Sequence, residues 1–234
     1  MYEQEILMPK TVRVASLTVI LLCLLCGCNQ RSSPPPPSVA QKQPAFKGTI
    51  VAVGDSLTAG YGVNEADAYP ARLERKLQAA GFNWRVINAG ISGETSSGTL
   101  SRVAWVLKLA PDIVILETGA NDGLRGIEPQ VTKKNIDETV RILKENKVTV
   151  ILAGMRMVTS MGRDYTLKFG AIYPAVAKKH ALILIPFFLQ DVAGVPDLNQ
   201  SDGIHPVAEG YRIITDMIYP YAVQALSSKT SSSR

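Results

Sequence analysis

The chain has 234 residues, of which 46% are hydrophobic and 19% charged, and its formal net charge is +5 at pH 7. This composition predicts a packed globular core and excludes a largely disordered chain, and its scattered basic residues predict no nucleic-acid partner. All three cysteines lie within the first 28 residues and only two histidines occur, which excludes a disulfide framework, a cysteine-ligated zinc site and a multi-histidine metal site from the body of the protein.

The first 27 residues have the features of a secretory signal peptide. A basic segment that ends at Arg13 precedes the apolar run Val14–Leu25. This run is shorter than the roughly 20 residues that a membrane-spanning helix needs, and a basic segment followed by a short apolar run is typical of an export signal. Met8 is an alternative to Met1 as the true start.

The apolar run ends in Leu25-Cys26-Gly27-Cys28, which resembles the lipobox of bacterial lipoproteins. In that class the cysteine after the small residue is lipidated and becomes the first residue of the mature protein. The resemblance implies a membrane anchor on Cys28 and a place in the bacterial cell envelope, facing the periplasm. Asn29, where an Asp would mark inner-membrane retention, favours the outer membrane. An ordinary signal peptide or an uncleaved anchor is the alternative.

Residues 28–47 include four consecutive prolines and few residues that could be buried. Consecutive prolines favour the extended polyproline II conformation, so this segment predicts a tether between the membrane and the folded body. The folded body is expected at residues 48–226. The polar residues 227–234 are expected to form a disordered tail.

The folded body alternates short apolar runs with amphipathic segments, which predicts alternating strands and helices. In chain order the pattern predicts strand 48–55, helix 69–80, strand 85–88, helix 99–109, strand 112–117, helix 130–146, strand 148–153, helix 165–179, strand 182–186 and helix 206–226. Such alternation is typical of right-handed crossovers between the strands of a parallel sheet whose two faces are both covered by helices. The predicted fold class is therefore α/β.

Reactive side chains follow the predicted strands, at the edge where a parallel sheet binds its ligands. A serine needs a base to act as a nucleophile, and Ser56 directly follows the first strand. His205 is one of the two histidines, and Asp202 lies three residues before it, close enough to orient the imidazole. These residues predict a Ser-His-Asp triad. His180, at the end of a predicted helix, is expected to be exposed to solvent.

A Ser-His-Asp triad also needs hydrogen-bond donors for the oxyanion that forms when a carbonyl carbon is attacked. The backbone N–H groups of Ser56 and Gly93 are two candidate donors, and the Asn121 side-chain amide is a third. Glycine at position 93 lets a substrate approach the backbone closely. Asp55 and Asp122 are expected to be structural hydrogen-bonding groups.

Four segments, in their order and spacing, resemble the four sequence blocks of the GDSL or SGNH hydrolase family. They are Gly54-Asp55-Ser56-Leu57, the segment with Gly93, Gly119-Ala120-Asn121-Asp122 and Asp202-Gly203-Ile204-His205-Pro206. In detail, the sequence is most similar to the thioesterase I/arylesterase/lysophospholipase L1 branch of that family, and the similarity covers about residues 48–226. The resemblance implies a three-layer αβα sandwich around a five-stranded, mainly parallel sheet of flavodoxin-like type.

The same resemblance implies roles for single residues. Ser56 is the expected nucleophile and Asp202 and His205 complete the triad, while Gly93, Asn121 and the Ser56 N–H form the oxyanion hole. No metal or organic cofactor is implied. The expected function is a monomeric serine esterase that hydrolyses carboxylic esters and thioesters, such as lysophospholipids, acyl esters and aryl esters. The alternatives are a carbohydrate O-acetylesterase acting on envelope glycans and a non-catalytic lipid-binding lipoprotein.

Each candidate residue also has a structural interpretation. Gly54-Asp55-Ser56 after a strand is a common turn or helix N-cap, and Asp202-Gly203 is a common turn. Arg156, after the fourth predicted strand, is expected to have a surface or structural role. Tyr61 and residues 155–161 are candidates for lining the acyl-binding pocket.

Overall fold

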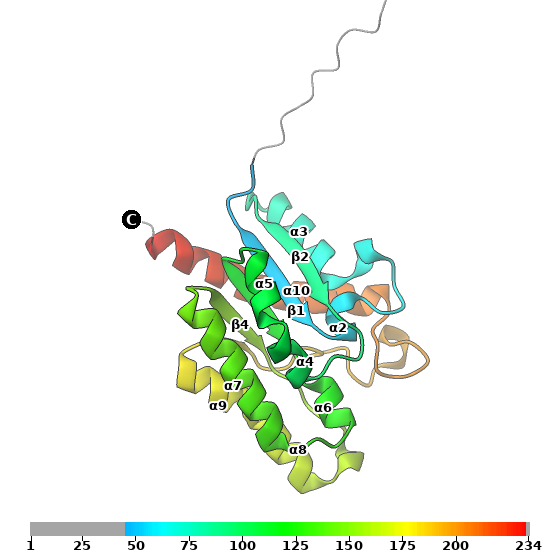
Figure 1. The fold of residues 1–234 in the computed structure, drawn as a ribbon. Helices are drawn as coiled ribbons and strands as arrows, with labels where there is room; N and C mark the ends of the chain where they lie inside the picture. Colours follow the sequence, from blue (N-terminus) through cyan, green and yellow to red (C-terminus); the bar gives the residue numbers. More distant parts are fainter. Residues whose placement is uncertain (1–44, 233–234) are drawn as a thin grey trace, which may run out of the picture. The chain divides into compact units, whose positions relative to one another are not determined.

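The computed structural model describes residues 45–232. The predicted signal peptide at residues 1–27, Cys28 and most of the predicted tether therefore lie outside the described residues. The described chain forms one compact unit, shown in Figure 1. None of its helices combines the length and apolar character that crossing a membrane requires.

Five strands form one parallel sheet in the order β2-β1-β3-β4-β5. Their bounds are Thr49–Gly54 for β1, Arg85–Gly90 for β2, Ile113–Glu117 for β3, Thr149–Ala153 for β4 and Ile183–Ile185 for β5. The three central strands are nearly continuous Val, Ile and Leu, as expected where both faces of a parallel sheet are covered. This order is the flavodoxin-like one, so the predicted fold is confirmed.

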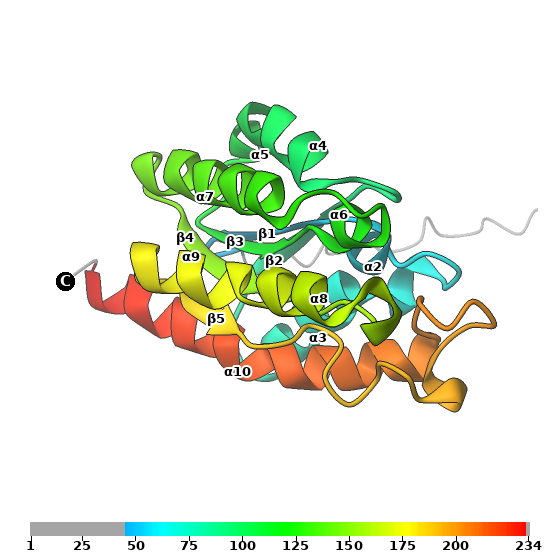
Figure 2. The same cartoon turned by 90° about the horizontal axis from the view of Figure 1, so that it is seen from below.

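Helices cover both faces of the sheet, which gives three layers (Figure 2). One face carries α3 (Tyr69–Ala79) and α10 (Ala208–Ser232), which pack against each other. The other carries α4 (Ser96–Ser101), α5 (Val103–Lys108), α7 (Pro129–Glu145), α8 (Arg163–Gly170) and α9 (Ile172–His180). The connections contain two short helices and three 3-10 turns: α2 (Ser56–Ala59), α6 (Ala120–Leu124), η2 (Glu65–Asp67), η3 (Thr159–Met161) and η4 (Pro196–Leu198).

Two predicted helices are each divided in two. The helix expected at 99–109 is α4 and α5, which meet at Arg102, where the backbone leaves the helical region at φ −106° and ψ 7°. The helix expected at 165–179 is α8 and α9, which meet at Ala171. Pro174 follows this junction and has no N–H to donate to the carbonyl of Gly170, so the hydrogen-bond ladder is interrupted there.

The prediction of a disordered tail at residues 227–234 is wrong for 227–232, because α10 continues to Ser232. Hydroxyl groups of the serine-rich segment bond back to the helix, with Ser227 donating to the Val223 carbonyl at 3.0 Å and Ser228 to the Ala225 carbonyl at 2.7 Å. Lys229 donates to the Lys147 carbonyl at 3.2 Å. These bonds tie the last turns of α10 to themselves and to the domain.

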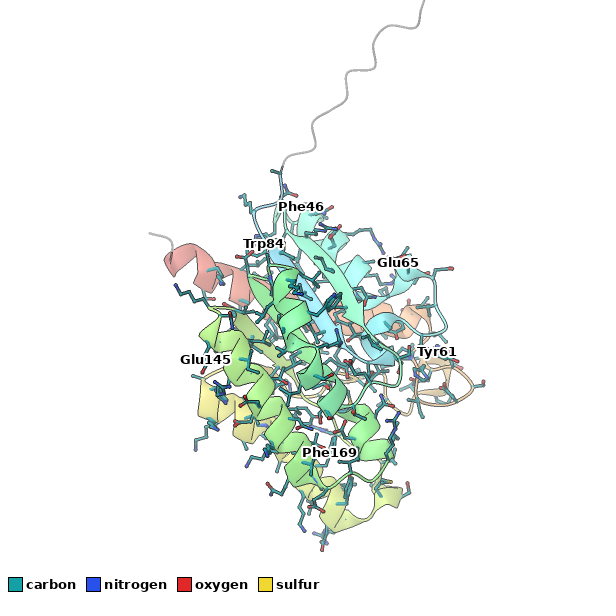
Figure 3. All side chains as sticks on the ribbon, in the orientation of Figure 1. Phe46, Tyr61, Glu65, Trp84, Glu145 and Phe169 are labelled. Atoms are coloured by element: carbon teal, nitrogen blue, oxygen red, sulfur yellow. The ribbon has the colours of Figure 1, made fainter. Side chains whose placement is uncertain are left out.

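At the other end of the described chain, the last residues of the predicted tether already contact the domain. The Lys47 N–H donates to the Asn83 carbonyl at 2.8 Å, and the Asn83 amide donates to the Ala45 carbonyl at 2.9 Å. Phe46 and Trp84, which precede β1 and β2, lie at one end of the domain in Figure 3, and Tyr61, which follows β1, lies away from them. The chain therefore enters the domain at the amino ends of the strands.

Candidate active site

Ser56 is the first residue of α2, immediately after β1 turns into that helix. The turn requires glycine at position 54, because a Cβ there would lie 2.1 Å from Thr58 Oγ1 and 2.4 Å from Glu117 Oε2. Asp55 caps α2, with its Oδ1 accepting the Leu57 N–H at 2.9 Å. The end of a central strand thus holds the Ser56 hydroxyl at the carboxyl edge of the sheet.

His205 and Asp202 lie in the loop between η4 and α10 and reach Ser56. His205 Nε2 is 2.8 Å from Ser56 Oγ, and His205 Nδ1 is 2.6 Å from Asp202 Oδ2. The other Asp202 oxygen accepts the backbone N–H groups of Ile204 and His205, at 2.8 and 3.0 Å. The hydrogen bonds from the His205 ring and these two N–H groups lower the pKa of Asp202 to about 2. An ionised Asp202 fixes the proton on Nδ1, so Nε2 is left to accept the serine proton.

The loop that follows α2 supports this histidine. The Tyr61 ring lies 4.7 Å from the His205 ring, centroid to centroid, and is half exposed. The Gln200 amide donates to the carbonyls of Tyr61 and Pro206, at 2.8 and 3.1 Å, and the Gln200 N–H donates to the His205 carbonyl at 2.7 Å. Gln200 therefore joins the serine and histidine loops.

The three predicted oxyanion donors lie in the loops after β1, β2 and β3. Gly93 has φ +79°, the left-handed region that glycine favours, in a turn closed by a 3.1 Å bond from the Glu94 N–H to the Ile91 carbonyl. Asn121, in α6, donates through Nδ2 to Asp55 Oδ2 at 3.1 Å. No group among residues 45–232 accepts a hydrogen bond from the Ser56 or Gly93 N–H. These two N–H groups are free to bind a substrate oxygen.

A buried ion pair fastens the Gly93 loop to the sheet. Arg102 donates through Nε and Nη2 to the two oxygens of Glu94, both at 2.6 Å, and the two side chains are only 12% and 7% exposed. Arg102 Nη2 also reaches the Gly54 carbonyl at 3.4 Å, and the Ile91 N–H donates to the same carbonyl at 2.9 Å. The Gly93 loop is thus bonded directly to the end of the strand that precedes Ser56.

Asp122 anchors α6, as expected of a structural aspartate. Its Oδ2 accepts the Ser96 N–H at 2.7 Å, and its Oδ1 accepts the hydroxyls of Ser96 at 2.5 Å and Thr132 at 3.1 Å. These bonds connect α6 with α4 and α7. They leave the neighbouring Asn121 side chain pointing to Asp55.

Two carboxyl groups are buried behind the serine. Asp55 is 1% exposed and Glu117, the last residue of β3, is fully buried. Burial raises the pKa of Asp55 to about 6, against the opposing effect of its hydrogen bonds. Burial, and then the nearby Asp55 charge, raise the pKa of Glu117 well above its usual range.

Sequence reasoning misses the supporting residues Glu94, Arg102 and Glu117. The only signal is that an acidic residue ends an otherwise apolar strand at Glu117.

His180 is not exposed as expected: its side chain is 14% exposed and its Nε2 lies 2.8 Å from Asp137 Oδ1, outside the site. Within the described ranges, no three His, Cys, Asp or Glu side chains cluster as metal ligands would.

The residues proposed for the acyl pocket have different environments. Met155 is buried in the core, contrary to its expected place in the pocket. Met157 packs on Gly123 of α6, next to the Asn121 segment. Val158 is exposed, and Arg156 stacks on the Phe187 ring at 5.0 Å.

Comparison with known proteins adds sequence and fold relationships. Residues 52–213 match the GDSL-like Lipase/Acylhydrolase family model. The chain is 39% identical over 169 residues to thioesterase 1/protease 1/lysophospholipase L1 of Escherichia coli K12, covering 72% of this chain and 80% of that protein. It is 35% identical over 179 residues to esterase TesA of Pseudomonas aeruginosa, covering 76% and 89%.

A solved structure agrees with the sequence relatives. The psychrotrophic esterase EstA from Pseudoalteromonas sp., in a form inhibited by monoethylphosphonate, is 31% identical and superimposes with a TM-score of 0.73. The match covers 77% of this chain and 99% of the other.

The Glu94–Arg102 pair generates a prediction about stability. Replacing Arg102 by Met leaves a buried, uncompensated carboxylate, which costs about 3–5 kcal/mol in the free energy of unfolding. Urea denaturation of the purified protein measures this loss. The double variant Glu94→Met/Arg102→Met should recover part of it, because no isolated charge remains buried. A loss below about 1 kcal/mol in the single variant, typical of exposed pairs, would contradict the structural role of the pair.

Proposed function

Because the chain belongs to the GDSL-like lipase/acylhydrolase family, we propose that it is a serine esterase with a Ser56–His205–Asp202 triad and a covalent acyl-enzyme. The chain is an ester-bond hydrolase by family. One observation carries the residue assignment: the continuous hydrogen-bonded row from Ser56 Oγ through the His205 ring to Asp202, with distances of 2.8 and 2.6 Å.

The proposed reaction has two halves. Ser56 Oγ attacks the ester carbonyl carbon while His205 Nε2 takes the hydroxyl proton, and Asp202 stabilises the imidazolium that forms. The tetrahedral intermediate expels the alcohol, which receives that proton from His205, and an acyl-Ser56 ester remains. Water then attacks this ester with His205 again as the base, which releases the acid and restores Ser56.

The oxyanion formed in each half would be stabilised by the N–H groups of Ser56 and Gly93 and by the Asn121 amide. Asn121 has two amide N–H groups and uses one of them on Asp55, so the other remains for the substrate. Donors that are already oriented before the reaction lose little reorganisation energy during it. No step of this mechanism requires a metal or an organic cofactor.

Exposed apolar side chains at the carboxyl edge of the sheet support a lipid-like substrate. Tyr61, Ile91, Leu124, Val158 and Ile204 are each exposed by 41–58%, and they come from the connections that follow β1, β2, β3, β4 and β5, with Leu124 at the end of α6. An apolar surface around a catalytic site suits an acyl chain more than a sugar. We therefore place fatty-acyl esters and lysophospholipids ahead of acetylated glycans as substrates, and we propose that the enzyme acts as a monomer.

The proposed location follows from the sequence, since the residues concerned lie outside the described structure. A lipid on Cys28 would hold the enzyme at the periplasmic side of the cell envelope, at the outer membrane. Acyl-CoA is a cytosolic thioester, so an exported enzyme would meet lysophospholipids and other small esters instead.

Ser56→Ala tests the nucleophile. The variant should keep its circular dichroism spectrum and lose ester hydrolysis, because no other group can form the acyl-enzyme. A fluorophosphonate probe should label the wild-type protein at Ser56 and leave the variant unlabelled. A folded Ser56→Ala variant with a tenth or more of the wild-type rate would overturn the assignment, and failure to label Ser56 in wild type would favour a non-catalytic lipid-binding role.

Acyl-chain length tests the substrate class. Each methylene buried against the apolar loops contributes up to about 0.8 kcal/mol, or up to roughly fourfold in kcat/KM. Medium-chain p-nitrophenyl esters should therefore be cleaved faster than the acetate, and fatty acid should be released from lysophosphatidylethanolamine. The Ser56→Ala protein measures the background. A steady fall in kcat/KM from acetate to octanoate, without release of fatty acid, would favour the O-acetylesterase alternative.

Mass spectrometry tests the proposed anchor. Protein purified from a bacterial membrane should begin at Cys28 and carry a diacylglyceryl group there, because the lipobox places the cleavage before this cysteine. The matched variant Cys28→Ser should lack the lipid. A mature N-terminus at another residue within or after the apolar run would mean that an ordinary signal peptide is removed. An N-terminus at Met1 or Met8 would mean that the segment stays as an uncleaved anchor.

A further inference from the structure

The carboxyl group of Glu117 lies directly behind the turn that carries Ser56. Glu117 ends β3, beside the end of β1, and its side chain is fully buried. Its Oε2 accepts the Asp55 N–H at 3.2 Å and the Thr58 hydroxyl at 2.9 Å. The proposed mechanism assigns no role to this buried acid.

Asp55 connects this acid with the proposed oxyanion hole. Its two oxygens accept the Leu57 N–H and the Asn121 amide, and its own backbone N–H donates to Glu117 Oε2. The other Glu117 oxygen, Oε1, is buried without a hydrogen-bond partner in the described chain. Two neighbouring acids that are buried without a cation cannot both stay ionised at low cost, so one of the pair carries a proton. No lysine or arginine in the described part of the chain forms an ion pair with either group.

The surroundings place this proton on Glu117. The titratable groups that face Glu117, besides Asp55, are the phenols of Tyr69 from α3, Tyr211 from α10 and Tyr173 from α9, and none of them is a cation. Asp55 receives two N–H donors, from Leu57 and Asn121, whereas Glu117 Oε1 receives none. Ionising Asp55 therefore costs less free energy than ionising Glu117.

We propose that Glu117 is a positioning residue, whose protonated carboxyl group donates to Asp55 and keeps that carboxylate in place as the acceptor that orients the Asn121 amide. This inference rests on the proposed serine-esterase mechanism, in which Asn121 binds the oxyanion. Glu117 touches no substrate and acts only through Asp55. Its neutral form lets a second acid lie beside an anion in the interior without adding a second charge.

Glu117→Gln and Glu117→Leu separate this role from packing alone. Glutamine keeps the oxygen that accepts from Asp55 and Thr58 and supplies a permanent N–H donor, so its kcat at pH 7.5 should stay within about threefold of wild type, well short of the loss from a missing oxyanion donor. Leucine removes both functions, so kcat should fall by roughly 10- to 100-fold while KM changes little. Asn121→Ala removes the amide donor itself, so its kcat should fall by about 10²–10³-fold.

The dependence of stability on pH gives a readout that does not involve catalysis. The folded protein holds the Glu117 proton to higher pH than the unfolded chain, so stability falls as pH rises from the unfolded value towards the folded one. Above pH 7, where Asp55 with its pKa of about 6 is largely ionised, the Tm of wild type should fall relative to that of Glu117→Gln. The expected difference is roughly 3–5 °C per pH unit until Glu117 ionises.

A matched control and three outcomes decide the proposal. Leu143→Ala, in the α7 core near the amino end of β4, should lose stability but keep its kcat. Three results would each overturn the inference. The Tm of wild type and of Glu117→Gln could change with pH in parallel, the kcat of Glu117→Gln could be as low as that of Glu117→Leu, or the kcat of Glu117→Leu could equal that of wild type. If Glu117→Leu does not fold, the glutamine variant still decides. Failure of the serine mechanism would instead appear as activity in Ser56→Ala, with the Tm curves unaffected.

Discussion

The arrangement of the site depends on one constraint: β1 is paired in parallel with both β2 and β3, so three chain segments turn at the same edge of the sheet. Val53 is level with Ala89 on one side and Leu116 on the other. The serine turn, the Gly93 turn and the start of α6 are neighbours for this reason. Only the histidine loop, after β5, must reach the site from farther along the chain.

Polar contacts stabilise the carboxyl edge of the sheet, whereas apolar packing stabilises the centre of the sheet. Asp55, Glu117, Asp122, Ser96 and Thr99 are each at most 1% exposed, and each has a hydrogen-bond partner in the described chain. A buried polar group costs free energy unless it is bonded, so such a network stabilises one arrangement of its loops and penalises others. The buried groups behind Ser56 therefore help to fix the position of that residue.

The sequence predicts the parts of the fold that follow from local pattern. All five strands are predicted because an apolar run between polar ends has few alternatives. Ser56 is a candidate nucleophile because it directly follows a strand, and Asp202 and His205 are candidates because they stand three residues apart just before the last helix. The break at Arg102 is not predicted, since the side chain of that residue bonds to Glu94. The break at Ala171 has a local signal, Pro174, which the prediction of one continuous helix does not use. Glu117 and Asp55 are 62 residues apart in the chain, so no local pattern connects them.

The direction of β1 also bears on how a tethered enzyme would meet its substrate. The chain enters at the amino ends of the strands, and Ser56 lies at the other end of β1, whose six residues span about 20 Å. An extended polyproline II chain with the 16 residues that separate Cys28 from Ala45 would span about 50 Å. If the proposed anchor and tether exist in this form, the site could turn towards the membrane or away from it. An anchor would then raise the local concentration of the enzyme at the envelope without fixing which surface it serves.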